Sequence, residues 1–187
     1  MAFSCATRKV FSILPLLVFL TITPLSSSFS PNDKVRKELL NQLCSKPTIA
    51  NHFCIAWLNS DPTTYTLNLN SLIDLVLQKT QLFGYKNLAM MKGFVRTTTD
   101  PTLKIPYGSC VADYELAIKS IEEAQGFSSS MSYKLASQAA FKAFNSVSLC
   151  EAQLQGRKNV PVYVPQSILT IKRMCTIDNV FSIVLTS

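Results

Sequence analysis

The sequence predicts an all-α fold: an up-down-up-down four-helix bundle preceded by a short helical hairpin that a disulfide holds together. Apolar residues recur at spacings of three and four, the period of a helix, and no segment alternates convincingly as a strand does. Four long amphipathic segments are separated by short breaks, which is typical of helices packed antiparallel to their neighbours in sequence. The elements below follow in chain order.

The first 28 residues have the layout of a secretory signal peptide. Arg8 and Lys9 precede the uncharged run VFSILPLLVFLTI at 10–22, and small residues follow in TPLSSSFS. A membrane span needs about 20 apolar residues, so a retained anchor is the less favoured alternative. We predict cleavage after Ser28, with Ser30 as the alternative, and no membrane association of the mature chain.

Two short helices are expected in the mature chain before the bundle begins. Helical spacing of apolar residues predicts them at 32–43 and 47–58, and the break NSDPTTYT at 59–66 ends this hairpin. We place the hairpin within residues 29–60 and the bundle within 61–187, with the two forming one domain.

Four longer apolar stripes predict the bundle helices, and a proline is expected to interrupt the regular geometry of the second one. Asp100 is suited to cap a helix that has Pro101 at its first position. Pro106 lies early in the same stripe, so we expect either a kink there or a helix that starts only near Tyr107. The four stripes cover 69–94, 103–124, 136–150 and 168–184, with breaks at 97–101, 126–132 and 156–165.

Five cysteines remain once the signal peptide is removed, and an oxidising compartment favours disulfides between them. The chain has one histidine and no C-x-x-C motif, so neither a zinc site nor a thioredoxin-type redox site is expected, and no metal or cofactor is predicted. Cys44 and Cys54, which have nine residues between them in the hairpin, are therefore expected to form a disulfide.

The other disulfide follows from the antiparallel arrangement of the second and third bundle helices. Residues equidistant from the turn lie level with each other, and the midpoint of Cys110 and Cys150 is 130, inside the break at 126–132. A Cys110–Cys150 disulfide would therefore join facing helices. Cys175 is left as a free thiol, expected to be buried as a small apolar residue, with a reactive thiol as the less favoured alternative.

The charge of the chain excludes few classes of function, and its distribution does not indicate nucleic-acid binding. The sequence has 18 Lys and Arg against 11 Asp and Glu, a net charge of +7, and removal of Arg8 and Lys9 lowers it to +5. The basic residues are scattered and are not interleaved with aromatic residues, so solvated helix faces are expected and nucleic-acid binding is not. An acidic partner remains compatible with this charge.

No arrangement of residues typical of catalysis is present, and we predict no catalytic residues. G-x-S-x-G, P-loop and H-E-x-x-H motifs are absent, and His52 lies inside the disulfide loop. Glu122 and Glu123 are adjacent on a helix and point in different directions. Asp178 lies within an apolar helix, where a buried hydrogen-bonding role is favoured over catalysis. The chain is therefore expected to be a binding protein.

The chain resembles the plant invertase and pectin methylesterase inhibitors. The resemblance rests on four segments together with the C-x3-Y pattern at Cys110 and Tyr114 and with Asn179. Segments SDP and DPTLK are closer to the invertase-inhibitor branch. The segments are LCSKPTIANHFCIAWLNSDP (43–62), DPTLKIPYGSCVADYELAIKSIEEA (100–124), YKLASQAAFKAFNSVSLCEAQL (133–154) and LTIKRMCTIDNVFSIVL (169–185).

The resemblance implies a secreted four-helix bundle that covers the active-site cleft of a target enzyme, one to one and without covalent chemistry. It also implies pairing of the first cysteine with the second and of the third with the fourth. Invertase inhibitors present a Pro-Lys-Phe motif whose place is held here by Tyr133, Lys134 and Leu135. A lysine entering a cleft lined with carboxylates would gain charge-assisted hydrogen bonds. The alternative is that Tyr133 and Leu135 are core residues and Lys134 is solvated.

The expected partner is therefore an acid invertase, with a pectin methylesterase as the alternative target. A helical bundle that inhibits neither enzyme is a further alternative, and an enzyme is the least favoured one. We expect a monomer in the apoplast, with delivery to the vacuole as the other possible destination.

Overall fold

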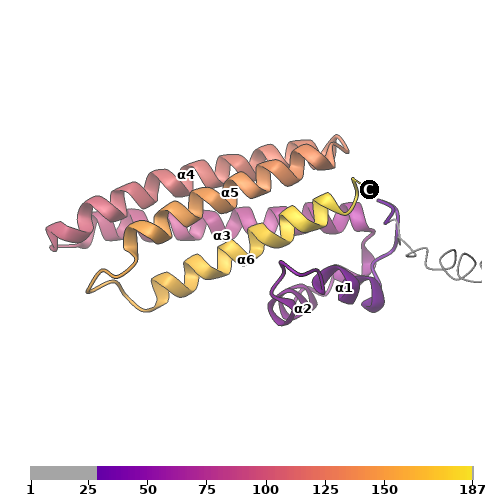
Figure 1. The fold of residues 1–187 in the computed structure, drawn as a ribbon, viewed down its shortest axis with the longest axis horizontal. Helices are drawn as coiled ribbons and strands as arrows, with labels where there is room; N and C mark the ends of the chain where they lie inside the picture. Colours follow the sequence, from indigo (N-terminus) through magenta and orange to yellow (C-terminus); the bar gives the residue numbers. More distant parts are fainter. Residues whose placement is uncertain (1–28, 187) are drawn as a thin grey trace, which may run out of the picture.

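The structure, a computed structural model, describes residues 29–186, and the regular elements in that range are helices joined by short connections. Helices α3 to α6 form an up-down-up-down four-helix bundle, and α1 and α2 form a hairpin beside one end of it (Figure 1), which confirms the predicted fold class. The expected signal peptide at 1–28 lies outside the described residues. The helices are α1 (Lys37–Cys44), α2 (Asn51–Asn59), α3 (Leu69–Thr97), α4 (Pro101–Ser129), α5 (Tyr133–Leu154) and α6 (Tyr163–Ile183), with a 3-10 turn, η1, at Thr64–Thr66.

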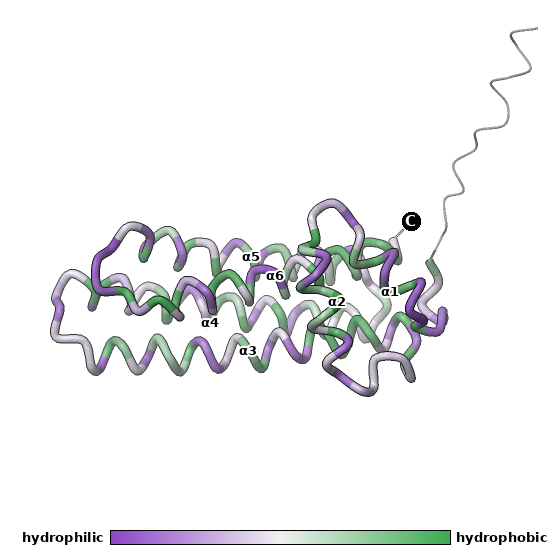
Figure 2. Tube along the Cα trace, turned by 90° about the horizontal axis from the view of Figure 1, so that it is seen from below, coloured by the Kyte–Doolittle hydropathy of each residue, from purple (hydrophilic) through white to green (hydrophobic). Residues whose placement is uncertain are grey.

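The core of the bundle lies between the apolar faces of the four long helices, and green and purple stretches alternate along each of them in Figure 2. Helix α5 contributes small residues: Ala136, Ala140 and Ala143 are fully buried. Because these side chains are short, α4 and α5 approach closely, and the Cα atoms of Cys110 and Cys150 are 4.6 Å apart. The small-residue face therefore sets the spacing at which these two helices can be joined.

Helix α4 is continuous through Pro106, so a helix starting near Tyr107 was the wrong alternative. Asp100 caps the helix by accepting a hydrogen bond from the Thr102 amide at 2.9 Å. Pro106 has no N–H to donate to the Thr102 carbonyl, which would lose its helical partner. The Arg157 guanidinium, from the connection after α5, donates to that carbonyl at 3.1 Å. A side chain from another element thus supplies the hydrogen bond that the proline removes.

The break expected at 126–132 is shorter than predicted, because α4 continues to Ser129. Ser128 is fully buried there, and its hydroxyl donates to the Asp74 carboxylate of α3 at 2.7 Å. This contact between helices outweighs the low helix propensity of glycine and serine in the segment. The turn reduces to residues 130–132 and includes Met131 at a positive φ of 57°.

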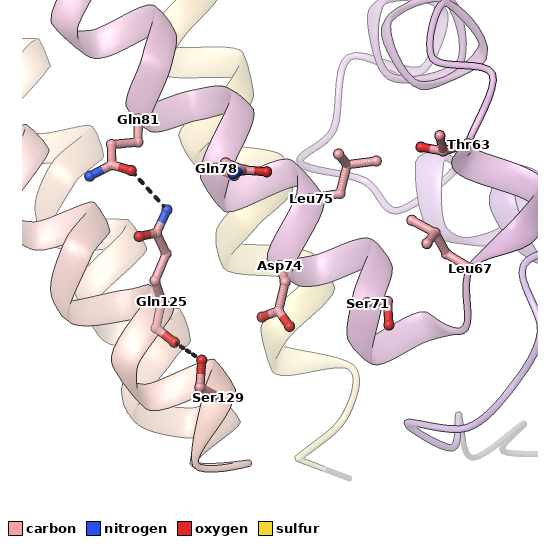
Figure 3. A pocket seen from close by; sticks show the side chains of 9 residues that line it. All are labelled: Thr63, Leu67, Ser71, Asp74, Leu75, Gln78, Gln81, Gln125 and Ser129. Carbon is pink, nitrogen blue, oxygen red and sulfur yellow. Dashed lines mark hydrogen bonds between the residues drawn. The ribbon is translucent and has the colours of Figure 1, made fainter.

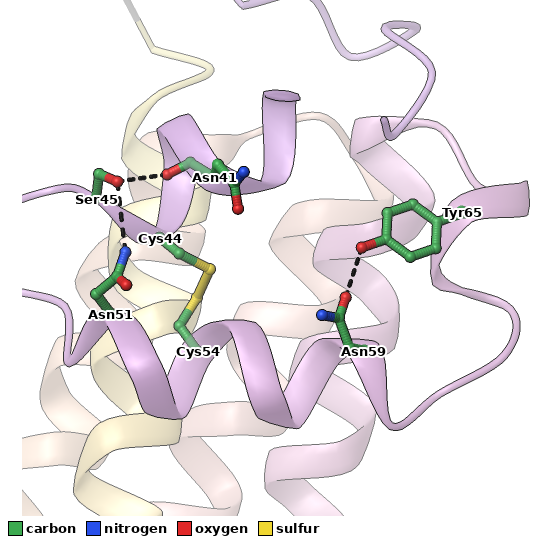
Figure 4. Close-up of a disulfide and its surroundings, with 7 residues drawn as sticks. All are labelled: Asn41, Cys44, Ser45, Asn51, Cys54, Asn59 and Tyr65. Carbon is green, nitrogen blue, oxygen red and sulfur yellow. Dashed lines mark hydrogen bonds between the residues drawn. A yellow bond between two sulfur atoms is a disulfide. The ribbon is translucent and has the colours of Figure 1, made fainter. Parts of the chain in front are cut away.

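The hairpin is closed by the Cys44–Cys54 disulfide (Figure 4). Helix α2 begins at Asn51, so Pro47 lies in the connecting turn rather than at the helix start that was expected. The N-terminal segment is also tied to the bundle, because the Val35 amide donates to the Leu67 carbonyl at 3.0 Å.

An ion pair connects the segment after α2 to the bundle. The Lys79 ammonium of α3 lies 2.8 Å from the Asp61 carboxylate. Hydrogen bonds from Lys79 and from Thr63 hold the pKa of Asp61 below its ordinary value. The break after the hairpin is therefore held against α3 by side-chain contacts.

A second disulfide joins Cys110 of α4 to Cys150 of α5, and Cys175 of α6 is a free, buried cysteine. These are the pairs expected from the positions of the cysteines in the sequence. In the described range, no helix is both long enough and apolar enough to cross a membrane.

Candidate functional site

The segment Tyr133-Lys134-Leu135 opens helix α5, and its three side chains lie in different environments. Tyr133 is buried and its hydroxyl donates to the Asn70 side chain of α3 at 2.9 Å. Burial raises the pKa of that hydroxyl. Tyr133 therefore anchors the start of α5 to α3 and does not face solvent.

Lys134 and Leu135 are exposed, and Leu135 keeps 45% of its surface accessible. Met131, in the turn just before α5, is 67% exposed. One cation and two apolar side chains thus project from the end of the bundle at which α4 turns into α5. We call Met131, Lys134 and Leu135 the turn surface.

A polar groove of about 490 Å³ lies near the same end of the bundle, between α3, the end of α4 and the segment before α3 (Figure 3). The Gln125 side chain of α4 donates to the Gln81 side chain of α3 at 3.2 Å across it. Amide and hydroxyl groups both donate and accept hydrogen bonds, so the groove suits a polar partner. Its lining is Thr63, Leu67, Ser71, Asp74, Leu75, Gln78, Gln81, Gln125 and Ser129.

The groove contains one carboxylate, that of Asp74, and its lining residues include no His or Cys. Within residues 29–186, no cluster of three or more His, Cys, Asp or Glu side chains could hold a metal ion. Glu122 accepts hydrogen bonds from Gln81 and Tyr85, and Glu123 pairs with Lys142. The two glutamates thus make separate surface contacts and do not converge on a shared site.

Asp178 lies in the core of the bundle, fully buried on α6. Neither carboxylate oxygen has a hydrogen-bond partner within the described chain. Burial raises its pKa to about 8, an effect that the nearby Thr80 hydroxyl of α3 offsets only in part. Because the Asp178 carboxyl is buried, a substrate in solution does not reach it. Its protonation state therefore affects the stability of the fold.

The turn surface and the groove therefore offer shape, charge and hydrogen bonds, which suit binding to another macromolecule. Comparison with known proteins identifies the kind of binding protein. The model of the family described as plant invertase/pectin methylesterase inhibitor matches residues 38–183. The chain belongs to this family. The match extends from α1 to the end of α6, so it includes the hairpin and all four bundle helices.

Relatives of this inhibitor-family chain are named pectinesterase inhibitors. A pectinesterase inhibitor of Actinidia deliciosa is 31% identical over 182 residues, which is 97% of this chain and 96% of that protein. Pectinesterase inhibitor 1 of Arabidopsis thaliana is 27% identical over 176 residues, covering 91% and 92% of the two chains.

The fold of a solved family member agrees with this assignment. The crystal structure of mutant form A of a pectin methylesterase inhibitor from Arabidopsis superposes with a TM-score of 0.71 at 28% identity. The superposition covers 76% of this chain and 94% of that one. The helical-bundle fold is therefore shared with an inhibitor of known structure.

Sequence reasoning selected the start of α5 but missed the groove. No local signal marks Gln78 and Gln81 of α3 or Gln125 and Ser129 of α4, because these residues follow no motif. The spacing of Gln78 and Gln81 places both on one face of α3, but only the packing of α4 shows that Gln125 faces them.

Proposed function

We propose that this chain is a secreted protein inhibitor of a plant pectin methylesterase, and that it acts by one-to-one, non-covalent blocking of the active-site cleft of the enzyme. The observation that carries the proposal is the end-to-end similarity to the Actinidia deliciosa pectinesterase inhibitor, at 31% identity over 97% of this chain. The inhibitor itself performs no catalysis in this proposal.

The choice of target departs from the expectation drawn from the sequence, which placed an acid invertase first. The relatives compared above are named pectinesterase inhibitors, and two solved structures that match are described as pectin methylesterase inhibitors. Of the Pro-Lys-Phe motif of invertase inhibitors, this chain keeps only the central lysine, as Lys134. Pectin methylesterase is therefore the first target to test and acid invertase the second.

The turn surface is the contact that we propose for the target. Lys134 supplies a mobile cation that can donate charge-assisted hydrogen bonds to carboxylates in a cleft. Met131 and Leu135 flank it with exposed apolar area, which favours burial against a partner. The buried Tyr133 and the Cys110–Cys150 disulfide hold α5 in place, so little ordering is needed on binding.

A titration of the purified protein against a pectin methylesterase and, in parallel, an acid invertase tests the proposal. At mildly acidic pH, we expect methylesterase activity to fall stoichiometrically, with an end point of one inhibitor per enzyme, and invertase activity to persist. Loss of invertase activity alone would move the function to the second target. No loss of either activity, with a folded and oxidised protein, would refute the proposal.

The contact surface makes a separate prediction. Lys134→Ala should raise the inhibition constant about tenfold, equivalent to about 1.4 kcal/mol, because the charged partner groups lose a donor. Inhibition constants of wild type and variant measured at low and moderate salt provide the readout. Lys119→Ala, at an exposed lysine of α4, removes the same charge elsewhere and should leave the inhibition constant unchanged. Equal effects of the two substitutions would rule out a specific contact at Lys134.

A further inference from the structure

The end of the bundle away from the hairpin carries positive charge that inhibition at the turn surface does not use. It is formed by the link between α3 and α4 and by the connection between α5 and α6, at the left of Figure 1. Figure 2 colours the second of these connections strongly hydrophilic. Four exposed basic residues lie here, and we call them the distal basic cluster: Arg96, Lys104, Arg157 and Lys158.

Contacts between elements hold the two connections together at this end. Arg157 donates to the Thr102 carbonyl in the first turn of α4, so the α5–α6 connection lies against α4. The Phe94 ring of α3 lies 6.1 Å from the Tyr163 ring at the start of α6. The cations therefore share one end of the bundle although they come from three parts of the sequence.

Acidic side chains do not neutralise the distal basic cluster. Asp100 lies at this end, but its carboxylate caps α4 by accepting from the amide and the hydroxyl of Thr102. Among the described residues, no acidic side chain forms an ion pair with a member of the cluster. The ion pairs that the structure contains use Lys79, Lys92, Lys142 and Lys172.

Apolar side chains stand exposed next to these cations. Ile105 is 78% exposed, Val162 77% and Tyr163 54%. Ile105 directly follows Lys104 on α4, whereas Val162 and Tyr163 are adjacent to each other at the start of α6. An exposed tyrosine ring offers a flat apolar surface with a hydroxyl at its edge, on which a sugar ring can pack and accept a hydrogen bond.

We propose that the distal basic cluster binds an acidic polysaccharide that carries closely spaced carboxylates, as pectin does after its methyl esters are removed. The choice of this polymer rests on the proposed function, because a pectinesterase produces such carboxylates. A polyanion engages several cations at once and releases its bound counterions, so a few lysines and arginines suffice. An anionic bilayer fits less well, because binding flat on a membrane typically uses the apolar face of one amphipathic helix, whereas the exposed apolar residues here come from two separate segments.

The two surfaces lie far enough apart to be occupied together. Helix α4 has 29 residues and therefore extends about 43 Å from the cluster to the turn that precedes α5. A polysaccharide held at one end does not cover the turn surface at the other. Binding would concentrate the inhibitor where the enzyme has already removed esters, and so where its target acts.

Binding of the protein, as secreted by plant cells, to polygalacturonate tests the proposal without any enzyme present. We expect binding that weakens steeply between about 50 and 300 mM salt and that is absent with fully methyl-esterified pectin of similar length. Lys104→Glu/Lys158→Glu should weaken binding at least about tenfold. Lys34→Glu/Lys37→Glu makes the same change in net charge near the hairpin and should weaken it by about twofold or less. Arg157 is left intact because it bonds to α4.

The proposal is overturned by equal loss in the two double variants, by equal binding to esterified pectin, or by binding to anionic phosphatidylserine vesicles but not to polygalacturonate. Thermal melting of both double variants, followed by circular dichroism, shows whether a loss of binding is caused by unfolding. Enzyme inhibition by Lys104→Glu/Lys158→Glu is measured separately and should match wild type. If the protein inhibits the enzyme but does not bind polygalacturonate, the polysaccharide site is refuted and the proposed function stands. If it binds polygalacturonate but does not inhibit the enzyme, the proposed function is refuted and the polysaccharide site stands.

Discussion

Removing the Cys110–Cys150 disulfide is expected to lower the free energy of unfolding by about 4 kcal/mol, the chain-entropy value for a closed loop of about 40 residues. For a chain of this size, the melting temperature should fall by roughly 10 °C. The bond joins α4 to α5 where the Cα atoms of the two cysteines are 4.6 Å apart, so its loss removes the covalent link between these helices. The double variant Cys110→Ser/Cys150→Ser is preferable, since a single variant leaves a free thiol able to pair with Cys175.

Thermal unfolding of the oxidised wild type and of this double variant, followed by circular dichroism, measures the effect. Cys175→Ala provides the matched control, because it removes a buried sulfur that forms no disulfide. Its cost should stay near 1 kcal/mol, the value of a small cavity. A loss from Cys175→Ala as large as that from the double variant would contradict the pairing.

The fold could be predicted because its main signals are local and periodic. Apolar residues at helical spacing marked all four bundle helices, and the midpoint of Cys110 and Cys150 fell in the turn between α4 and α5. Errors arose where tertiary contacts override local rules. Pro106 predicted either a kink or a helix that starts only near Tyr107, and the later start was wrong, because Arg157, 51 positions later, supplies the missing hydrogen bond to Thr102. No local pattern reveals a donor so distant in sequence.

The candidate site was less accessible to sequence reasoning than the fold. Lys134 could be selected through a family resemblance, yet the sequence left open whether its neighbours face solvent. Packing shows that Tyr133 is buried against Asn70 whereas Leu135 is exposed, because the two point to different faces of α5. The groove beside α3 depends on how two helices meet, and its residues have no motif.

The buried Asp178 should make the protein most stable at acidic pH. Its pKa is about 8 in the folded chain against an ordinary value of 3.8, so the native state retains a proton that the unfolded chain releases. Between these two pKa values, a rise in pH favours unfolding by about 1.4 kcal/mol per pH unit. The contribution is complete below about pH 4, declines as pH rises, and is fully lost above about pH 8.

Asp178→Asn removes the ionisation while preserving the size of the side chain. We expect wild type to lose about 3 kcal/mol of stability relative to this variant between pH 5 and pH 7, measured by urea unfolding at each pH. Glu38→Gln, at an exposed residue of α1, should follow the wild-type profile. Parallel profiles of wild type and Asp178→Asn would show that the buried carboxyl does not hold its proton. With a neutral carboxyl, the core contains no unpaired charge, and the bundle that positions the turn surface is most rigid under mildly acidic conditions.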